Sequence, residues 1–437
     1  MKQIKRRASA ALLLALLMGA GTLTLLVRLL VHGDEWAAYS ANTSVYSSRG
    51  VLACGTLTDR NGVILAASEQ GDYRYSDDVN VRLGSLHAVG DYRGYIGGTA
   101  LSAFARKLTG YSPVYGTTRE GQDVALSLSA ELQSAAWREL GGRKGAVLIM
   151  NYETGEILCM VSCPSYDPLG EPDQSVEGIF LNRCTNAVYT PGSVFKLITV
   201  CAAIENIPDL EEKTYLCTGS YDVAGVEIKC MGSHGTQSAA QALQNSCNCA
   251  FAQIALELGG DTIAGYARKL GFTESHSLDG IVTAAGNVEA VKEKSSYLAW
   301  SGIGQHTDLI CPYSMLRYVA ALAGEGTLKE PTLLLGGSNG STRLLKKETA
   351  QIVAAYMPTY GGTFPGLKVS AKSGTAERGD GTSNAWMVGF LREDAPLAFV
   401  VVLEKGGGGL AKAGPAANAI LHRAVEVYKA EELTEHD

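Results

Sequence analysis

The sequence predicts an α+β protein whose main domain, residues 126–437, is built on one five-stranded antiparallel sheet flanked by helices. Two strand candidates open this region, three more lie near its end, and the chain between the two groups is mainly helical in pattern. Strands at both ends of a domain with helices between them favour a single sheet covered by those helices. A long apolar run and a small strand-rich segment precede the domain.

Composition indicates an ordinary globular protein. The 437 residues carry a formal net charge of −7, and 46% of them are hydrophobic. No basic stripe follows the first few residues, so nucleic-acid binding is not supported. Ten cysteines are too few for a disulfide scaffold in a chain of this length, and no two of them form a CxxC pair. We therefore expect neither a cofactor nor a metal.

The N-terminus has the pattern of a membrane anchor. Residues 8–27 are uncharged, and about 20 apolar residues span a bilayer as a helix. Four basic residues precede this run, which places the N-terminus in the cytoplasm: Lys2, Lys5, Arg6 and Arg7. A cleaved signal peptide is the alternative, but its apolar region is usually only about 7–15 residues long, and no A-x-A site follows. We expect residues 1–31 to be a cytoplasmic tip and a single-pass anchor in the cell membrane, with an extracytoplasmic catalytic domain.

Residues 32–125 are polar, glycine-rich and strand-like in pattern. The Asn61-Gly62 pair lies between two short apolar runs, which is a strong hairpin signal. The part rich in tyrosine and glycine, at about residues 90–116, contains no chemical motif. We expect this region to be a small β-rich stem domain.

The elements of residues 126–437 can be placed one by one. Ser129 is a plausible N-cap for a helix that ends at Gly141-Gly142. A hairpin follows over 145–162, turning at residues 153–155. The remaining candidates are three strands and one closing amphipathic helix: 367–375, 384–391, 396–404 and 413–430.

The pattern Ser193-x-x-Lys196 opens a nearly all-apolar run that ends before Pro208. A helix that is hydrophobic on every side is buried, and residues three apart share one helix face. Burial lowers the pKa of a lysine, and a neutral lysine beside a serine can take the hydroxyl proton and create a nucleophile. Taken alone, the pair is better explained as a helix cap with a snorkelling lysine.

Two further motifs change that balance. Ser246-Cys247-Asn248 stands just before a predicted helix, where both polar side chains could also serve as caps. The motif Lys372-Ser373-Gly374-Thr375 lies on a predicted strand, and a buried strand lysine is rare. S-x-x-K, S-x-N and K-[S/T]-G occurring in this order are the mark of penicillin-binding proteins and serine β-lactamases.

Each motif has a chemical role to fill in amide cleavage. Ser193 would attack the amide and Lys196 would take its proton, while Ser246 and Lys372 would relay that proton to the leaving group. Asn248 would hold the amide carbonyl of the substrate. The hydroxyls of Ser373 and Thr375 would bind a carboxylate, and the backbone N–H groups of Ser193 and Thr375 would form an oxyanion hole. Gly374 suits a strand that a ligand approaches closely.

The chain resembles the class B penicillin-binding proteins over nearly its whole length. Segments that match the family in order are TLTDRNGVILA, NYETGEILCMVSCPSYDP, NRCTNAVYTPGSVFKLIT, NSCNCAF, SGIGQ, AKSGTAE and NAWMVGF. The resemblance implies a β-lactamase-like transpeptidase fold and a peptidoglycan D,D-transpeptidase acting through an acyl-enzyme at Ser193. It implies D-Ala-D-Ala stem peptides as substrates and covalent inhibition by β-lactams. It also leaves room for a polytopic membrane glycosyltransferase as a partner.

Two departures from the family pattern stand near the motifs. Ser373 replaces the commoner threonine and keeps the hydroxyl. His306 follows SGIGQ where glycine is usual, so the loop there could differ.

Other serine acyl-enzymes remain open as alternatives. A D,D-carboxypeptidase fits the same motifs. A class A β-lactamase needs a glutamate that activates water, and no E-x-x-x-N occurs between residues 250 and 300. A non-catalytic β-lactam sensor or scaffold would keep the motif residues but not turn over a peptide.

Cys217 and Cys230 flank a predicted hairpin, and outside the membrane they could form a disulfide. With His234 they could instead contribute to a zinc site, but the sequence shows no evident fourth ligand. Cys247 and Cys249 are better interpreted as small packing residues.

Overall fold

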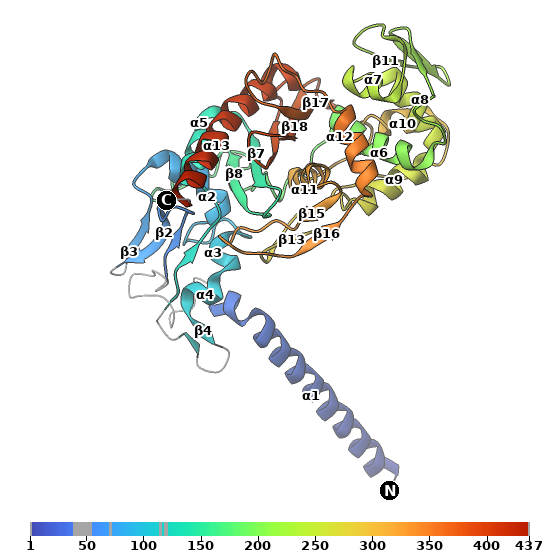
Figure 1. Ribbon diagram of the computed structural model, residues 1–437. Coiled ribbons are helices and arrows are strands. Elements are labelled where there is room, and N and C mark those ends of the chain that lie inside the picture. Colours follow the sequence, from blue (N-terminus) through green and yellow to red (C-terminus); the bar gives the residue numbers. More distant parts are fainter. Residues whose placement is uncertain (1, 38–54, 70–71, 113–115, 118–120, 436–437) are drawn as a thin grey trace.

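The computed structural model describes residues 2–37, 55–69, 72–112, 116–117 and 121–435 (Figure 1). It confirms the predicted α+β fold, with one central antiparallel sheet between layers of helices, an N-terminal apolar helix and a small N-terminal sheet.

Helix α1 (Lys2–Ala37) projects away from the rest of the molecule (Figure 1). An 18-residue window within its segment Gln3–Gly33 has a mean hydropathy of 2.3, and the segment is long enough to cross a membrane. The helix continues past residue 31, where we expected the anchor to end. Its length and composition are therefore those of a single-pass anchor.

The stem contains a four-stranded sheet of order β3-β2-β1-β6, in which β1 and β2 are antiparallel and β1 and β6 are parallel. The hairpin predicted at Asn61-Gly62 is the β1–β2 turn, with Gly62 at φ +82°. The strands of this region, including the separate β4–β5 pair, are β1 (Leu57–Thr58), β2 (Ile64–Glu69), β3 (Asp72–Tyr75), β4 (Tyr111–Ser112), β5 (Gly116–Thr117) and β6 (Val124–Ala125).

Three helices in the stem were not expected: α2 (Val79–Val89), α3 (Ala100–Ala103) and α4 (Ala105–Thr109). Asp78 caps α2 by accepting a hydrogen bond from the Asn80 backbone. The valines of α2 favour strands in isolation, and the buried C-terminal half of the helix packs against α5 (Ala130–Leu140). Tertiary packing therefore overrides local preference here, and the stem is mixed rather than β-rich.

The central sheet has the order β17-β18-β19-β7-β8, with every neighbouring pair antiparallel. All five strands lie where the sequence predicted them: β7 (Gly145–Asn151), β8 (Ile157–Cys163), β17 (Val369–Glu377), β18 (Ser383–Leu391) and β19 (Leu397–Leu403). Every residue of β7, β8 and β19 is buried, so helices must cover both faces.

Alternate residues of the sheet belong to two different cores. Val147 and Ile149 pack with α5 and with the closing helix α13 (Gly414–Glu435). Ala146 and Leu148 face the opposite layer. That layer contains α6 (Lys196–Asn206), α7 (Ala239–Gln244), α8 (Asn248–Leu258), α9 (Gly260–Lys269), α10 (Ser296–Ser301), α11 (Pro312–Ala323) and α12 (Lys347–Tyr356). As predicted, Ser129 caps α5 and Gly141 ends it.

Four small two-stranded antiparallel sheets accompany the helical layer. The pairs are β9 (Tyr215–Cys217) with β12 (Gly235–Gln237), β10 (Ser220–Val223) with β11 (Val226–Lys229), β13 (Ser277–Leu278) with β14 (Ile281–Val282), and β15 (Thr327–Lys329) with β16 (Ser341–Arg343). A 3₁₀ turn, Gly192–Phe195, leads into α6, and a π-helical turn, Gly409–Ala413, leads into α13.

Candidate active site

Ser193 lies in the 3₁₀ turn, and Lys196 is the first residue of α6. The turn is pressed against β17: a side chain on Gly192, which has φ +57°, would begin 2.9 Å from the Thr375 carbonyl oxygen. The Gly192 N–H also donates to the Gly304 carbonyl at 2.7 Å. These contacts fix the start of the helix, and with it the position of Ser193.

The side chain of Lys196 is fully buried. Its Nζ donates to the Ser246 carbonyl oxygen at 2.7 Å and to Asn248 Oδ1 at 2.7 Å. Burial lowers the pKa of Lys196 well below its usual value, and the nearby Lys372 lowers it further. Lys196 is thus held in place by neutral acceptors, and no carboxylate among the residues that the structure describes pairs with it.

Ser246 lies between the two motif lysines. Lys372 Nζ donates to Ser246 Oγ at 2.9 Å, and Lys196 Nζ lies 3.4 Å from the same oxygen. Burial alone lowers the pKa of Lys372 to about 7. The Ser246 backbone has φ +51°, a conformation that non-glycine residues rarely adopt. A single hydroxyl therefore connects two buried amines whose pKa values are both depressed.

Ser193, Asn248 and Thr375 line one cavity of about 270 Å³. The structure thus brings one residue from each of the three sequence motifs to a common surface. The buried contacts of Lys196, Ser246 and Lys372 link the same three motifs through hydrogen bonds.

Asn248 begins α8, one residue after the actual N-cap. We expected Ser246 or Asn248 to cap this helix, but Cys247 does so, its sulfur accepting the Ala250 N–H. Asn248 Nδ2 donates to the Lys229 carbonyl at 2.9 Å. An amide group has two N–H donors, so this contact leaves one for a ligand in the cavity.

The β17 motif presents its residues unequally. Thr375 Oγ1 accepts the Gly409 N–H at 3.0 Å, which leaves its own O–H free to donate. Ser373 is paired with Tyr360, whose hydroxyl lies 3.0 Å from its Oγ. For Gly374 we expected close approach by a ligand. Instead, a side chain there would begin 2.9 Å from the Pro191 carbonyl and 3.0 Å from Val194 Cγ1, so the protein itself occupies that space.

The cavity also contains residues that the motifs did not point to. They are Glu227, Lys229, Trp300, Ile303, Gln305 and Glu377. Glu227 and Lys229 come from the β10–β11 hairpin, far from any motif in sequence. The sequence signals in this set were the SGIGQ segment, which supplies Ile303 and Gln305, and the AKSGTAE segment, which ends at Glu377.

At position 306 the family usually has glycine, and His306 keeps the left-handed backbone conformation that glycine favours. His306 has φ +69°, and histidine is among the residues that tolerate this region best. Its ring contacts that of Tyr297 in a tilted arrangement, with centroids 4.9 Å apart and the planes 48° apart. The substitution has therefore kept the turn and added an aromatic contact.

Cys217 and Cys230 lie close together, as expected, but both are free thiols. No disulfide joins any of the nine cysteines in the described ranges.

A larger cavity, of about 710 Å³, is lined by none of the motif residues. It contains mostly charged side chains, among them Arg143, Arg183 and Lys412. The chemistry therefore belongs to the smaller cavity.

Comparison with known proteins agrees with this geometry. Residues 145–422 match the family described as the penicillin binding protein transpeptidase domain. The peptidoglycan D,D-transpeptidase PbpA of Mycobacterium tuberculosis is 27% identical over 379 residues, which cover 76% of each chain.

Solved structures show the same fold. The ceftriaxone acyl-enzyme complex of M. tuberculosis penicillin-binding protein A superposes with a TM-score of 0.72 at 23% identity, over 84% of this chain and 97% of that one. PBP2 of Helicobacter pylori, solved in complex with MreC, superposes with a TM-score of 0.64 at 24% identity, over 71% of this chain and 65% of that one.

The family match spans well over half of the 437 residues and contains all three motifs. The resemblance noted in the sequence is thereby confirmed: this protein belongs to the penicillin-binding protein transpeptidase family and is a D,D-transpeptidase enzyme.

Proposed function

We propose that this protein cross-links peptidoglycan stem peptides through an acyl-enzyme at Ser193. The observation that carries the proposal is the buried chain Lys196–Ser246–Lys372 behind the cavity that Ser193 lines. Two buried lysines held by neutral acceptors supply both a base and a proton route, which an amide-cleaving serine needs.

In the first step, Ser193 Oγ attacks the carbonyl of the amide that joins the two terminal D-Ala residues. Its proton passes to neutral Lys196, and from there through the Ser246 hydroxyl and Lys372 to the leaving amine. The Oγ–C bond forms, the C–N bond breaks, and D-Ala leaves as a neutral amine. The pKa of Lys196 is lowered by burial and by Lys372, which favours the neutral form that a base requires.

Substrate recognition uses the cavity walls. The free N–H of Asn248 would hold the amide carbonyl of the stem peptide, and the Thr375 hydroxyl would donate to the terminal carboxylate. The backbone N–H groups of Ser193 and Thr375 would bind the oxyanion. Ser373 would also donate to the carboxylate when the Tyr360 hydroxyl is the donor in their contact, because the Ser373 O–H is then free.

In the second step an amine of a neighbouring stem peptide attacks the ester and releases Ser193. Water in place of that amine would give the carboxypeptidase product. Incubating the enzyme with a stem-peptide substrate and an amine acceptor, and then separating the products, distinguishes the two reactions. A sensor or scaffold would give neither product.

We also propose that α1 anchors the protein with its N-terminus in the cytoplasm. The support is the basic cluster before the apolar segment Gln3–Gly33. Protease added to intact spheroplasts should remove the bulk of the chain, and protection of residues 145–430 would contradict this orientation. A polytopic membrane glycosyltransferase is the partner we propose beside this anchor. A photo-crosslinker placed on exposed Leu17 of α1 should capture it, and one placed on exposed Lys329 of β15 should not.

A labelled β-lactam followed by intact mass tests the nucleophile. Its amide and carboxylate imitate the D-Ala-D-Ala end, so one adduct per chain should form, and it should map to Ser193. Ser193→Ala should abolish the adduct, while Ser373→Ala should still form it. An adduct on folded Ser193→Ala protein would refute the assignment.

A further inference from the structure

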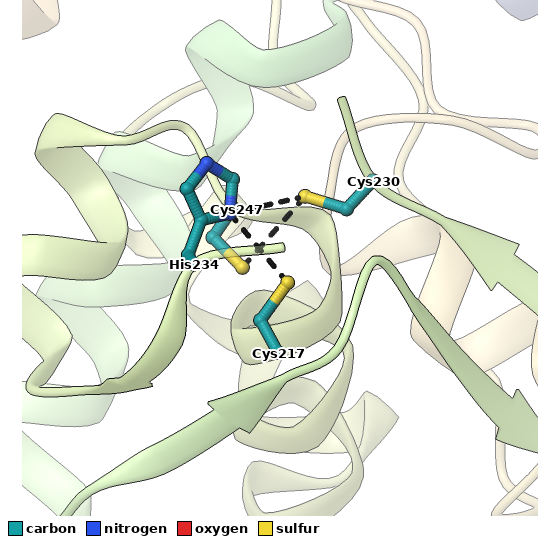
Figure 2. Close-up of side chains that lie close together, drawn as sticks. All are labelled: Cys217, Cys230, His234 and Cys247. Atoms are coloured by element: carbon teal, nitrogen blue, oxygen red, sulfur yellow. Dashed lines mark hydrogen bonds between the residues drawn. The ribbon is translucent and has the colours of Figure 1, made fainter. Parts of the chain in front are cut away.

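Four side chains that could each donate one ligand atom to a metal meet beside the active site. Cys217, Cys230, His234 and Cys247 have their sulfur and nitrogen atoms all within 4.8 Å of one another (Figure 2). We propose that they bind one Zn²⁺ ion, and that this ion fixes the segment that carries Ser246 and Asn248.

Three of the distances between ligand atoms match those of a tetrahedral site. With Zn–S bonds of about 2.3 Å and Zn–N bonds of about 2.0 Å, tetrahedral ligands would lie about 3.8 Å apart between sulfurs and about 3.5 Å between sulfur and nitrogen. The Cys230 and Cys247 sulfurs are 3.8 Å apart. His234 Nδ1 is 3.5 Å from the Cys217 sulfur and 3.6 Å from the Cys230 sulfur. A disulfide would instead require about 2.05 Å between two sulfurs.

The ligand chemistry selects zinc among the common metals. Three thiolates and one imidazole form a soft, closed, four-coordinate set of the kind that structural zinc sites use. Binding would release the three thiol protons to solvent, and His234 would keep its proton on Nε2 while coordinating through Nδ1.

Hydrogen bonds around the cluster suit thiolates. The Asn248 backbone N–H points at the Cys230 sulfur from 3.3 Å, and the Ala250 N–H points at the Cys247 sulfur from 3.4 Å. Such outer contacts orient metal ligands and stabilise their negative charge. They come from the first turn of α8, so the ligands and the helix N-terminus are already joined.

The ligands lie on small elements of structure. Cys217 ends β9, Cys230 follows β11, His234 precedes β12 and Cys247 is the N-cap of α8, and two-stranded sheets of this size are only marginally stable on their own. Three of the four residues of β11 are exposed, and Met231, next to Cys230, is 97% exposed. A bound metal would add to the few apolar side chains that these strands bury, Tyr215, Val223 and Ile228 among them, as it does in small scaffolds.

The same residues connect the cluster to the catalytic groups. Cys247 stands between Ser246 and Asn248, which supply the acceptors for Lys196. Lys229, adjacent to Cys230, accepts the Asn248 side-chain N–H. The four ligands are thus positioning residues: without the ion, Lys196 would lose its fixed partners. This last point depends on the proposed function, but zinc binding does not.

Metal content of the purified protein, kept reduced, tests the proposal first. Wild type should contain about one zinc per chain. Replacement by Co²⁺ should give the visible absorption of tetrahedral cobalt thiolate. His234→Ala should lower zinc affinity by at least about 10–100-fold, since loss of even an outer partner costs that much. His234→Cys should restore binding. The matched control is Cys249→Ala, two residues from Cys247 but outside the cluster, which should keep its zinc.

Three results would overturn the zinc site. One is wild type without zinc after incubation with Zn²⁺ and reductant. Another is equal zinc in His234→Ala and Cys249→Ala. The third is a disulfide. It would appear as a wild-type chain that, denatured without reductant, is two mass units lighter than the fully reduced chain, with two of the thiols of Cys217, Cys230 and Cys247 protected from alkylation. If His234→Ala fails to fold, wild type treated with a chelator serves instead: its melting temperature should fall and recover with Zn²⁺, and an unchanged value counts against the site.

A second measurement separates the positioning role from the zinc itself. The chelated protein should acylate more slowly with a β-lactam, and added Zn²⁺ should restore the rate. Zinc that can be removed without changing acylation would refute the positioning role only. Absence of acylation in zinc-loaded wild type would instead refute the proposed function.

Discussion

Lys372 Nζ donates a hydrogen bond to Ser246 Oγ at 2.9 Å, joining the central sheet to the helical layer across 126 positions of sequence. Neither partner lines the cavity of Ser193, Asn248 and Thr375, but each belongs to the same motif as one of these lining residues. The contact makes the charge state of one strand residue relevant both to stability and to proton transfer.

The first prediction concerns pH and stability. Burial lowers the pKa of Lys372 from 10.5 to about 7 in the folded protein. Between these values the unfolded chain binds a proton that the folded chain does not, so the free energy of unfolding should rise with pH through this window. Lys372→Met should flatten the rise, measured as melting temperature against pH. The exposed control Lys329→Met should keep the wild-type slope, and an equal slope in Lys372→Met would contradict the buried charge.

The second prediction has the opposite sign. Burial raises the pKa of Asp308 well above 3.8, and its Oδ1 has no hydrogen-bond partner among the described residues. Above pH 3.8 the folded state keeps a proton that the unfolded state loses, so stability should fall as pH rises toward the folded pKa. Asp308→Asn should remove that fall in denaturant titrations at several pH values. A variant that reproduced the wild-type decline would show that another group causes it.

The third prediction tests Lys196 as the base. Arginine stays protonated and cannot accept the Ser193 proton, so Lys196→Arg should slow β-lactam acylation by about 10²–10⁴-fold, the usual worth of a general base. Lys196→Met, which fits the buried space better, should be as slow. The second-order rate of adduct formation is the measurement. Rates within a few-fold of wild type in either folded variant would exclude Lys196 as the base.

The fourth prediction concerns close packing at Gly374. An added methyl group would meet the Pro191 carbonyl at 2.9 Å and Val194 Cγ1 at 3.0 Å, and overpacking of this kind costs about 1–3 kcal/mol. Gly374→Ala should therefore lower the free energy of unfolding and also slow acylation, since β17 would be pushed off the turn that holds Ser193. Gly379→Ala, with nothing within 4 Å, is the matched control. If Gly374→Ala had the wild-type free energy of unfolding and acylation rate, β17 would be able to move and accommodate the methyl group without cost.

The fifth prediction is a long-lived β-lactam adduct. Glu227 and Glu377 line the cavity but are exposed, so they lack the buried setting that tunes a carboxylate as a base. Glu227→Gln and Glu377→Gln should leave the adduct lifetime unchanged, as followed by intact mass over time. Rapid drug turnover by wild type, lost in one of these variants, would assign a β-lactamase activity instead.

The sequence predicted the central sheet well because its strands are continuous apolar runs, and it predicted the motif residues because their order is specific. It failed where long-range packing decides the outcome. Helix α2 forms against α5 despite its valines. Position 374 requires glycine because Pro191 and Val194 leave no space there for a side chain.

The division into anchor, stem and catalytic domain at residues 31 and 125 stays a prediction.

The four side chains of the proposed zinc site also could not be grouped from sequence patterns. Twelve residues separate Cys217 from Cys230 and twelve separate His234 from Cys247, so no short motif links them. The sequence indicated that Cys247 is a small packing residue. Its closeness to the other three side chains was not visible there, because it depends on two strand pairs that pack near the start of α8.

The Lys196–Ser246 and Ser246–Lys372 contacts join residues that are 50 and 126 positions apart in sequence. This separation matters for following the protein in cells. Contacts so distant in sequence form late in folding, because long loops must close first. In a partly folded or truncated chain Lys196 would thus lack the contacts that position it as the base for Ser193, and no drug would attach. A fluorescent β-lactam would therefore count only molecules that have completed folding, which makes it an assay of maturation as well as of inhibition.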